Sequence, residues 1–289
     1  MVNARRVGRL GILAVGLGIG AAVASTPGIA SADTPGTDPF SWLAGLDPGD
    51  LSAAALPAAS PFDLDISVDG HTLLDLGTGA TATSGTGDIA IAYGANSYAT
   101  AVNGFGNFAM ADGPSNRVDV NTGNFDSGTA FGNGSEVDVG NGDFDSGTVV
   151  GNGNFAEVGF GGNFDNGIAI GTNSDVYSES GSFDSAFSTG TESQAESLNG
   201  SYDTAAIFGN HSEAESDDGN GDLASVIDTG STGDTATASG NTDIASVLGD
   251  ASSATAGGPG DYDLAAVFGD MLHAVASGGN GMVDILPSL

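Results

Sequence analysis

The sequence predicts an all-β protein, a parallel β-solenoid (β-roll or β-helix) of about ten 19–21-residue coils with two short strands per coil. The first observation is a column of residues that recurs at this interval and is acidic at all positions but one. A repeat of roughly 20 to 50 residues is typical of solenoids, in which each unit contacts only its neighbours. We call this set the aspartate column: Asp88, Asn107, Asp126, Asp145, Asp165, Asp184, Asp203, Asp222, Asp243 and Asp263.

The second observation is that small or aliphatic residues recur in pairs within each unit. The residue two positions after the aspartate column is always Ala or Gly, and the position four after it is also small or aliphatic, as in Ala224 and Val226. Another such pair stands eleven and thirteen positions after the column, as in Val118 and Val120. Because a period of two is typical of strands, each unit is expected to form two of them.

The third observation is a glycine six positions after the aspartate column in nine of the ten units, for example Gly94 and Gly151. Glycine adopts positive φ without a steric penalty, so a tight turn is expected between the two strands of each coil. With these patterns we assign residues 61–87 to an N-terminal capping coil, where Asp69 stands one repeat before Asp88. Residues 88–279 are assigned to the β-solenoid repeats and residues 280–289 to a C-terminal cap or tail.

The first 32 residues have the features of a secretory signal peptide. Arg5, Arg6 and Arg9 precede an apolar run over 10–24, and a small-x-small cleavage site follows at 30–32. The apolar run is short for a membrane span. Residues 33–60, rich in Pro, Ala and Gly, are assigned to a tether. We therefore expect a secreted or surface-associated protein without a transmembrane anchor.

Charge restricts the partners of the exported chain. All 37 acidic residues follow residue 32, whereas Arg117 is the only Lys or Arg after that point. Such a chain repels nucleic acid and anionic lipid and attracts cations or basic partners. It has no cysteine, so no disulfide contributes to its stability.

The aspartate column allows two interpretations. Aspartate side chains hydrogen-bond the backbone of tight turns, which would make the column structural. Alternatively, carboxylates stacked one coil apart repel each other unless a cation lies between them, which would make the column a Ca²⁺ ladder. The ladder would use Asp126, Asp145, Asp165, Asp184, Asp203 and Asp222.

Two further sets of residues concern the surface. A second acidic column, twelve positions after the first, is expected to face solvent. Large apolar residues such as Ile168 and Ile170 stand three and five positions after the aspartate column, so both faces of the first strand look buried and self-association is expected. The second acidic column comprises Asp119, Asp138, Glu157, Glu196, Glu215 and Asp234.

Three resemblances follow from these repeats. The segment Gly219-Asn220-Gly221-Asp222-Leu223 is similar to the Gly-rich nonapeptide repeat of Ca²⁺-binding β-rolls, which implies calcium-dependent folding. The unit from Asp88 to Ala101 resembles the head repeats of trimeric autotransporter adhesins. A signal peptide followed by Gly/Asn/Asp/Ala-rich repeats resembles exported repeat proteins of mycobacteria and their relatives. The last two resemblances imply a role at the cell surface.

No catalytic constellation is recognisable, so we expect a non-enzymatic protein. His71, His211 and His273 stand in different units, without metal-ligand spacing. We expect a cell-surface or matrix interaction and spacer protein that self-associates or binds a cell-envelope component, a protein or a glycan. We expect no cofactor for such a protein. The alternatives are a calcium-binding β-roll with calcium-dependent folding, for which Ca²⁺ is the cofactor, and a polysaccharide-active β-helix enzyme.

Overall fold

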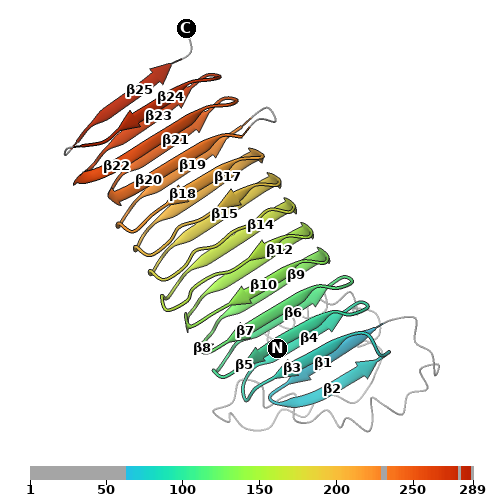
Figure 1. The fold of residues 1–289 in the computed structure, drawn as a ribbon. Coiled ribbons are helices and arrows are strands. Elements are labelled where there is room, and N and C mark those ends of the chain that lie inside the picture. Colours follow the sequence, from blue (N-terminus) through green and yellow to red (C-terminus); the bar gives the residue numbers. More distant parts are fainter. Residues whose placement is uncertain (1–62, 229–232, 279–280, 288–289) are drawn as a thin grey trace, which may run out of the picture. The chain divides into compact units, whose positions relative to one another are not determined.

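The computed structural model describes residues 63–228, 233–278 and 281–287, and the predicted signal peptide and tether lie outside them. The described part is all-β and forms a parallel β-solenoid with a repeat of about 19 residues, as predicted (Figure 1). One side of the solenoid is a thirteen-stranded sheet. In spatial order its strands are β2 (His71–Leu76), β1 (Leu64–Val68), β4 (Ile89–Tyr93), β6 (Phe108–Asp112), β9 (Ser127–Asn133), β12 (Ser146–Asn152), β14 (Asn166–Thr172), β15 (Ser185–Thr191), β17 (Thr204–Asn210), β19 (Leu223–Ile227), β21 (Ile244–Leu248), β23 (Leu264–Phe268) and β25 (Val283–Pro287).

The second strand of each coil, except in the coil between β14 and β15, belongs to one of two five-stranded sheets on the opposite side. Between these sheets the backbone hydrogen bonds continue from coil to coil, for example from Tyr177 N to Ala195 O at 3.1 Å. A short two-stranded ladder of β8 (Gly123–Asn124) and β11 (Gly142–Asp143) lies in the connecting turns. The first five-stranded sheet contains β3 (Thr81–Ser84), β5 (Tyr98–Val102), β7 (Arg117–Asn121), β10 (Glu136–Val139) and β13 (Phe155–Ala156), and the second β16 (Gln194–Ala195), β18 (Glu213–Ser216), β20 (Thr235–Asn241), β22 (Ser253–Asp261) and β24 (His273–Ala276).

The core is a single thin layer of small side chains between the two sides. The paired columns recognised in the sequence both point inward, and residues such as Ala205, Val118 and Val247 have no exposed surface. Side-chain sizes compensate across the layer. A Cβ built on Gly128 would lie 2.6 Å from Val118 Cγ1 and 2.9 Å from Val120 Cγ2, so valines fill the space that the glycine leaves. The restriction to Ala or Gly in the facing column is therefore a packing requirement.

The glycines six positions after the aspartate column form the predicted turns, and eight of the nine have positive φ. Close approach between coils is a second reason for glycine here. A Cβ on Gly151 would lie 1.8 Å from the carbonyl oxygen of Gly171 in the next coil, a distance that no side chain tolerates. Each of these turns thus stacks directly on the turn that follows.

The N-terminal segment caps the solenoid in a way that differs from a coil. Strands β1 and β2 form an antiparallel hairpin, and β1 also pairs antiparallel with β4. Asp69, expected one repeat before Asp88, lies in the hairpin turn with φ of +52° and accepts a hydrogen bond from Gly87 N at 2.8 Å. At the other end, β25 continues the thirteen-stranded sheet within the segment assigned to a cap or tail.

Candidate functional site

The aspartate column forms a continuous line in the solenoid interior. Each member is at most 1% exposed. Its Oδ1 atom accepts a hydrogen bond from the backbone N–H of the next member, as in the 2.9 Å contact from Asp165 N to Asp145 Oδ1. The same contact links all the members from Asp88 to Asp263 at 2.8 to 3.1 Å, and Asp263 accepts from Met282 N at the C-terminal end. The structural interpretation thus accounts for one carboxyl oxygen of each residue.

The other carboxyl oxygen, Oδ2, is buried and has no hydrogen-bond partner in any aspartate of the column, as far as the described residues show. The contacts of Asn107, the one asparagine in the column, show which hydrogen bonds a side chain at this position can form. Its Oδ1 accepts from Asp126 N, while its Nδ2 donates to Gly123 O of the next coil at 3.1 Å. At Asp145, the carboxyl oxygen Oδ2 takes the place of the amide nitrogen Nδ2 of Asn107, and Gly162 O takes the place of Gly123 O. Both atoms lie close to Gly142, because a Cβ built on that glycine would be 2.2 Å from each of them. Two acceptors therefore face each other, and a proton on the carboxyl group would join them.

The environment of the column favours protonated carboxyl groups. Burial raises the pKa of Asp145 and Asp203 from about 3.8 to about 7, opposed in part by the backbone N–H donors. Burial likewise raises the pKa of Asp126, Asp165 and Asp184 to about 6. Neighbouring carboxylates act in the same direction: Asp126 and Asp143 raise the pKa of Asp145, and no cation contributes. A buried carboxyl group without a positive partner binds its proton more tightly than one in water.

The residues assigned to a Ca²⁺ ladder all lie in this column. The structure brings Asp126, Asp145, Asp165, Asp184, Asp203 and Asp222 into one line, each with Oδ1 bonded to a backbone amide. No group of three or more His, Cys, Asp or Glu side chains in the described ranges is arranged to hold a metal ion. Ca²⁺ normally takes six to eight oxygen ligands, so the ladder would have to draw on the Oδ2 atoms and backbone carbonyls. It stays a prediction.

A second buried polar column lies at the opposite turn of each coil. It includes one residue, Asp234, that was assigned from the sequence to the solvent-facing acidic column. Its members are mostly Ser or Asn, as in Ser135, whose backbone N–H donates to Asn116 Oδ1 at 3.0 Å. Asp234, assigned to the solvent-facing acidic column, is only 1% exposed and belongs here, where it accepts from Ser252 N at 2.6 Å. The coil between Asp222 and Asp243 spans 21 residues, so a fixed offset of twelve no longer selects an outward position.

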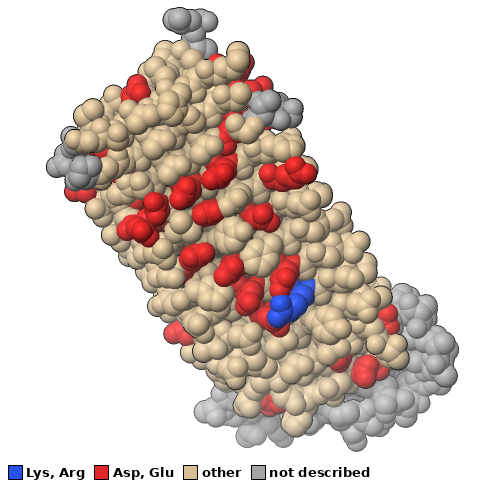
Figure 2. Space-filling view, in the orientation of Figure 1, with Lys and Arg blue, Asp and Glu red and all other residues tan. Residues whose placement is uncertain are grey.

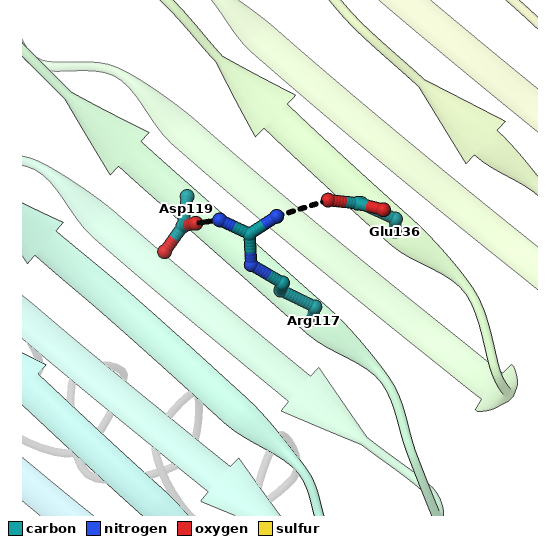
Figure 3. Close-up of polar contacts among 3 residues, drawn as sticks. All are labelled: Arg117, Asp119 and Glu136. Carbon is teal, nitrogen blue, oxygen red and sulfur yellow. Dashed lines mark hydrogen bonds and ion pairs between the residues drawn. The ribbon is translucent and has the colours of Figure 1, made fainter.

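The other members of the second acidic column point outward as predicted, although they are half-buried against their neighbours. They lie on the side of the five-stranded sheets, where Figure 2 shows acidic side chains spread along the face and a single basic one. That cation, Arg117, contacts Asp119 and Glu136 (Figure 3). We call this side the acidic face; its carboxylates are Asp119, Glu136, Asp138, Glu157, Asp175, Glu179, Glu196, Glu213, Glu215 and Asp217.

The outward side of the thirteen-stranded sheet is nearly free of charge. Over the ten strands from β4 to β23, the outward positions hold one ionisable carboxylate, Asp112. We call this side the neutral face. Of the ten positions five after the aspartate column, two are polar, Asp112 and Thr189. The other eight form an apolar row whose members are 38–49% exposed: Tyr93, Phe131, Val150, Ile170, Phe208, Ile227, Leu248 and Phe268. The sequence predicts burial on both faces of the first strand, but in the single chain these residues are exposed and form a surface.

An aromatic column along one turn was missed by sequence reasoning. Phe125, Phe144, Phe164, Phe183 and Tyr202 each precede a member of the aspartate column directly, and this spacing was available as a signal. Their rings stack in order, with centroids 4.9 to 5.2 Å apart and planes within 14° of parallel. All five have φ between +62° and +67° and are 48–65% exposed. Because the ring faces cover each other, the column exposes ring edges to solvent.

Replacing Phe164 tests the balance of stacking and backbone strain in this column. We expect Phe164→Ala to lower the free energy of unfolding by about 1 to 3 kcal/mol, since two ring contacts are lost. Phe164→Gly loses the same contacts but relieves a left-handed backbone that disfavours other residues by roughly 1–2 kcal/mol, so it should be the more stable variant in urea unfolding. An alanine variant more stable than the glycine variant would contradict the positive φ at this position.

Comparison with known proteins gave no match: no family model, no curated protein and no solved structure is similar to the chain at a significant level. No helix in the described part of the chain is long and apolar enough to cross a membrane. The functional argument therefore rests on the geometry and charge of the described residues.

Proposed function

We propose that this protein is exported and acts without catalysis as an interaction and spacer protein of the cell surface or extracellular matrix. The observation that carries the proposal is the segregation of charge between the two sides of the solenoid. The acidic face presents ten carboxylates and one arginine, whereas the neutral face presents one carboxylate between β4 and β23. A surface divided in this way suits binding better than reaction, because the acidic residues are spread in rows instead of converging on a cleft.

The solenoid also supports the spacer role. Every coil bonds to the next through backbone hydrogen bonds on both sides and through the aspartate column, which makes the stack a continuous hydrogen-bonded unit. With strands about 4.8 Å apart, twelve intervals in the thirteen-stranded sheet correspond to roughly 60 Å. The acidic face can thus offer carboxylates to a basic protein or an amino-containing glycan at regular intervals, while anionic nucleic acid is repelled.

The proposal is tested on intact bacteria that express the full chain with a C-terminal epitope. We expect cleavage after Ala32, removal of the epitope by added protease, and salt-sensitive binding of a fluorescent polylysine probe. A chain carrying Glu196→Gln, Glu213→Gln and Glu215→Gln should reach the surface equally but bind less of the probe. Retention of the chain inside the cell, or cleavage of cell-wall polysaccharide by the purified protein, would overturn the proposal.

A calcium-binding β-roll is the second candidate function. The observation that favours it is the row of buried Oδ2 atoms without partners, since a cation between successive carboxylates would also separate the facing acceptors.

Thermal melts at neutral pH decide this point. If Ca²⁺ binds the column, CaCl₂ should raise the melting temperature far more than MgCl₂ or NaCl at matched ionic strength, and Asp145→Asn with Asp165→Asn should reduce this increment. Equal effects of the three salts would indicate screening of surface charge alone and would retire the calcium hypothesis.

A further inference from the structure

The neutral face has the properties of a contact surface left uncovered in a single chain. Its outward side chains stand in register along the sheet, so that Val150 lies beside Phe131 on one side and Ile170 on the other. Flanking positions add half-buried apolar side chains such as Ile168 and Phe187. Asp112 and Thr189 interrupt the row. An exposed apolar strip of this length is nevertheless rare on monomeric soluble proteins and marks interaction sites.

The size of the face is sufficient for a stable interface. Ten strands about 4.8 Å apart, each with five residues at about 3.3 Å per residue, give a surface of roughly 800 Å². Specific protein–protein interfaces bury about 800 Å² on each partner. Contact over the whole neutral face therefore reaches the usual requirement without any contribution from the turns.

The charge of the neutral face and of the exported chain indicates which partner can bind this face. An anionic bilayer is disfavoured, because the neutral face carries no lysine or arginine between β4 and β23 and the exported chain is strongly acidic. A second copy brings an apolar row with the same strand spacing, so two such faces can pack like the sheets of a sandwich at about 10 Å. Face-to-face packing also keeps the two acidic faces on opposite outer sides, where they repel each other least.

We propose that two copies of this chain associate through their neutral faces and form a closed dimer with both acidic faces outward. A two-fold contact of identical faces is satisfied by one partner and does not propagate into a fibre. The dimer deepens the proposed function, on which it rests, by naming a second copy as one partner and doubling the number of acidic faces. A monomeric protein at the cell surface would overturn this inference alone, whereas a dimer retained inside the cell would overturn the proposed function alone.

The test is the mass in solution of the protein purified after export, measured by sedimentation equilibrium over a range of concentrations. We expect a dimer for the unmodified protein and at least tenfold weaker association for Ile170→Glu combined with Ile227→Glu. The matched control is Val275→Glu combined with Val102→Glu on the opposite side, where Val275 is 43% exposed against 41% for Ile170. The control adds the same charge and should remain dimeric.

Circular dichroism and thermal melts of all forms show whether each variant is folded. A monomeric unmodified protein, or a dimer that the control weakens as much as the neutral-face variant, would overturn the inference. Mass that grows without limit and is insensitive to Ile170→Glu would instead indicate end-to-end pairing through the terminal strand β25, and would also overturn it.

Discussion

Replacement of Ala205 by Phe is expected to lower the melting temperature by about 2 to 12 °C, whereas replacement of Glu215 by Gln should leave it nearly unchanged. Ala205 has no exposed surface and lies in register between Ala186 and Ala224 in the neighbouring coils. Overpacking of such a site costs about 1 to 3 kcal/mol, and a domain of this size loses about 2–4 °C per kcal/mol. The thin core has no free volume into which a phenyl ring can move.

Glu215 provides the control because its side chain points outward from β18 on the acidic face. Burial against its neighbours raises the pKa of Glu215, so a neutral amide is tolerated there. Both variants are compared by circular-dichroism melts at one pH and salt concentration. Similar melting temperatures would mean that the column containing Ala205 does not face a packed core.

The stability of the protein is expected to fall as the pH rises from about 4 to about 8. Folding raises the pKa of Asp145 and Asp203 to about 7, so the folded state binds these protons more tightly than the unfolded state. This contribution is fully present below the ordinary pKa of about 3.8 and is lost as the pH rises through 6 to 7. Each unit of pKa shift corresponds to about 1.4 kcal/mol per residue.

Asp145→Asn separates the buried column from general repulsion among surface charges. The asparagine is expected to repeat the geometry of Asn107, accepting from Asp165 N and donating to Gly162 O. At pH 8 it should therefore exceed the unmodified protein in stability by at least about 2 kcal/mol, whereas at pH 4 the two should be similar.

Urea unfolding at pH 4 and pH 8 in high salt measures the difference. Glu213→Gln removes the same charge from the exposed side of β18 and should have little effect in high salt. Asp145→Asn with lower stability than the unmodified protein at pH 8 would show that the ionised carboxylate is required, as a bound cation would require it.

The fold was predictable because a solenoid repeats each local environment about ten times. The position of Ala205 admits only Ala or Gly in every coil, and the contacts of Gly128 with Val118 and Val120 give the physical reason. The capping hairpin was not predictable from alternation, because parallel and antiparallel strands share a period of two. Within the segment assigned to the capping coil, only the pairing of Leu64–Val68 with β2 and β4 reveals the reversal.

The candidate site was predicted less completely. The aspartate column was found, but its burial did not follow from the sequence, because the first strand of each coil carries small residues on one side and large apolar residues on the other. The structure resolves this by placing Ala169 inside and Ile170 outside. Asp234 was misplaced because the longer coil around it shifts the register, and the aromatic column went unrecognised although Phe144 and Phe164 precede aspartates in successive coils.

The central claim is that the solenoid holds a line of buried, proton-binding carboxyl groups, and ¹³C NMR of the aspartate carboxyl carbons tests it most directly. Spectra recorded between pH 3 and pH 9 follow each carboxyl group, and the signal that disappears in Asp145→Asn identifies Asp145. We predict that this signal titrates with a midpoint near pH 7, the pKa to which burial raises this group. A midpoint at or below the ordinary pKa of about 3.8 would contradict the claim, because it would mean that Asp145 is solvated or paired with a cation in the folded protein.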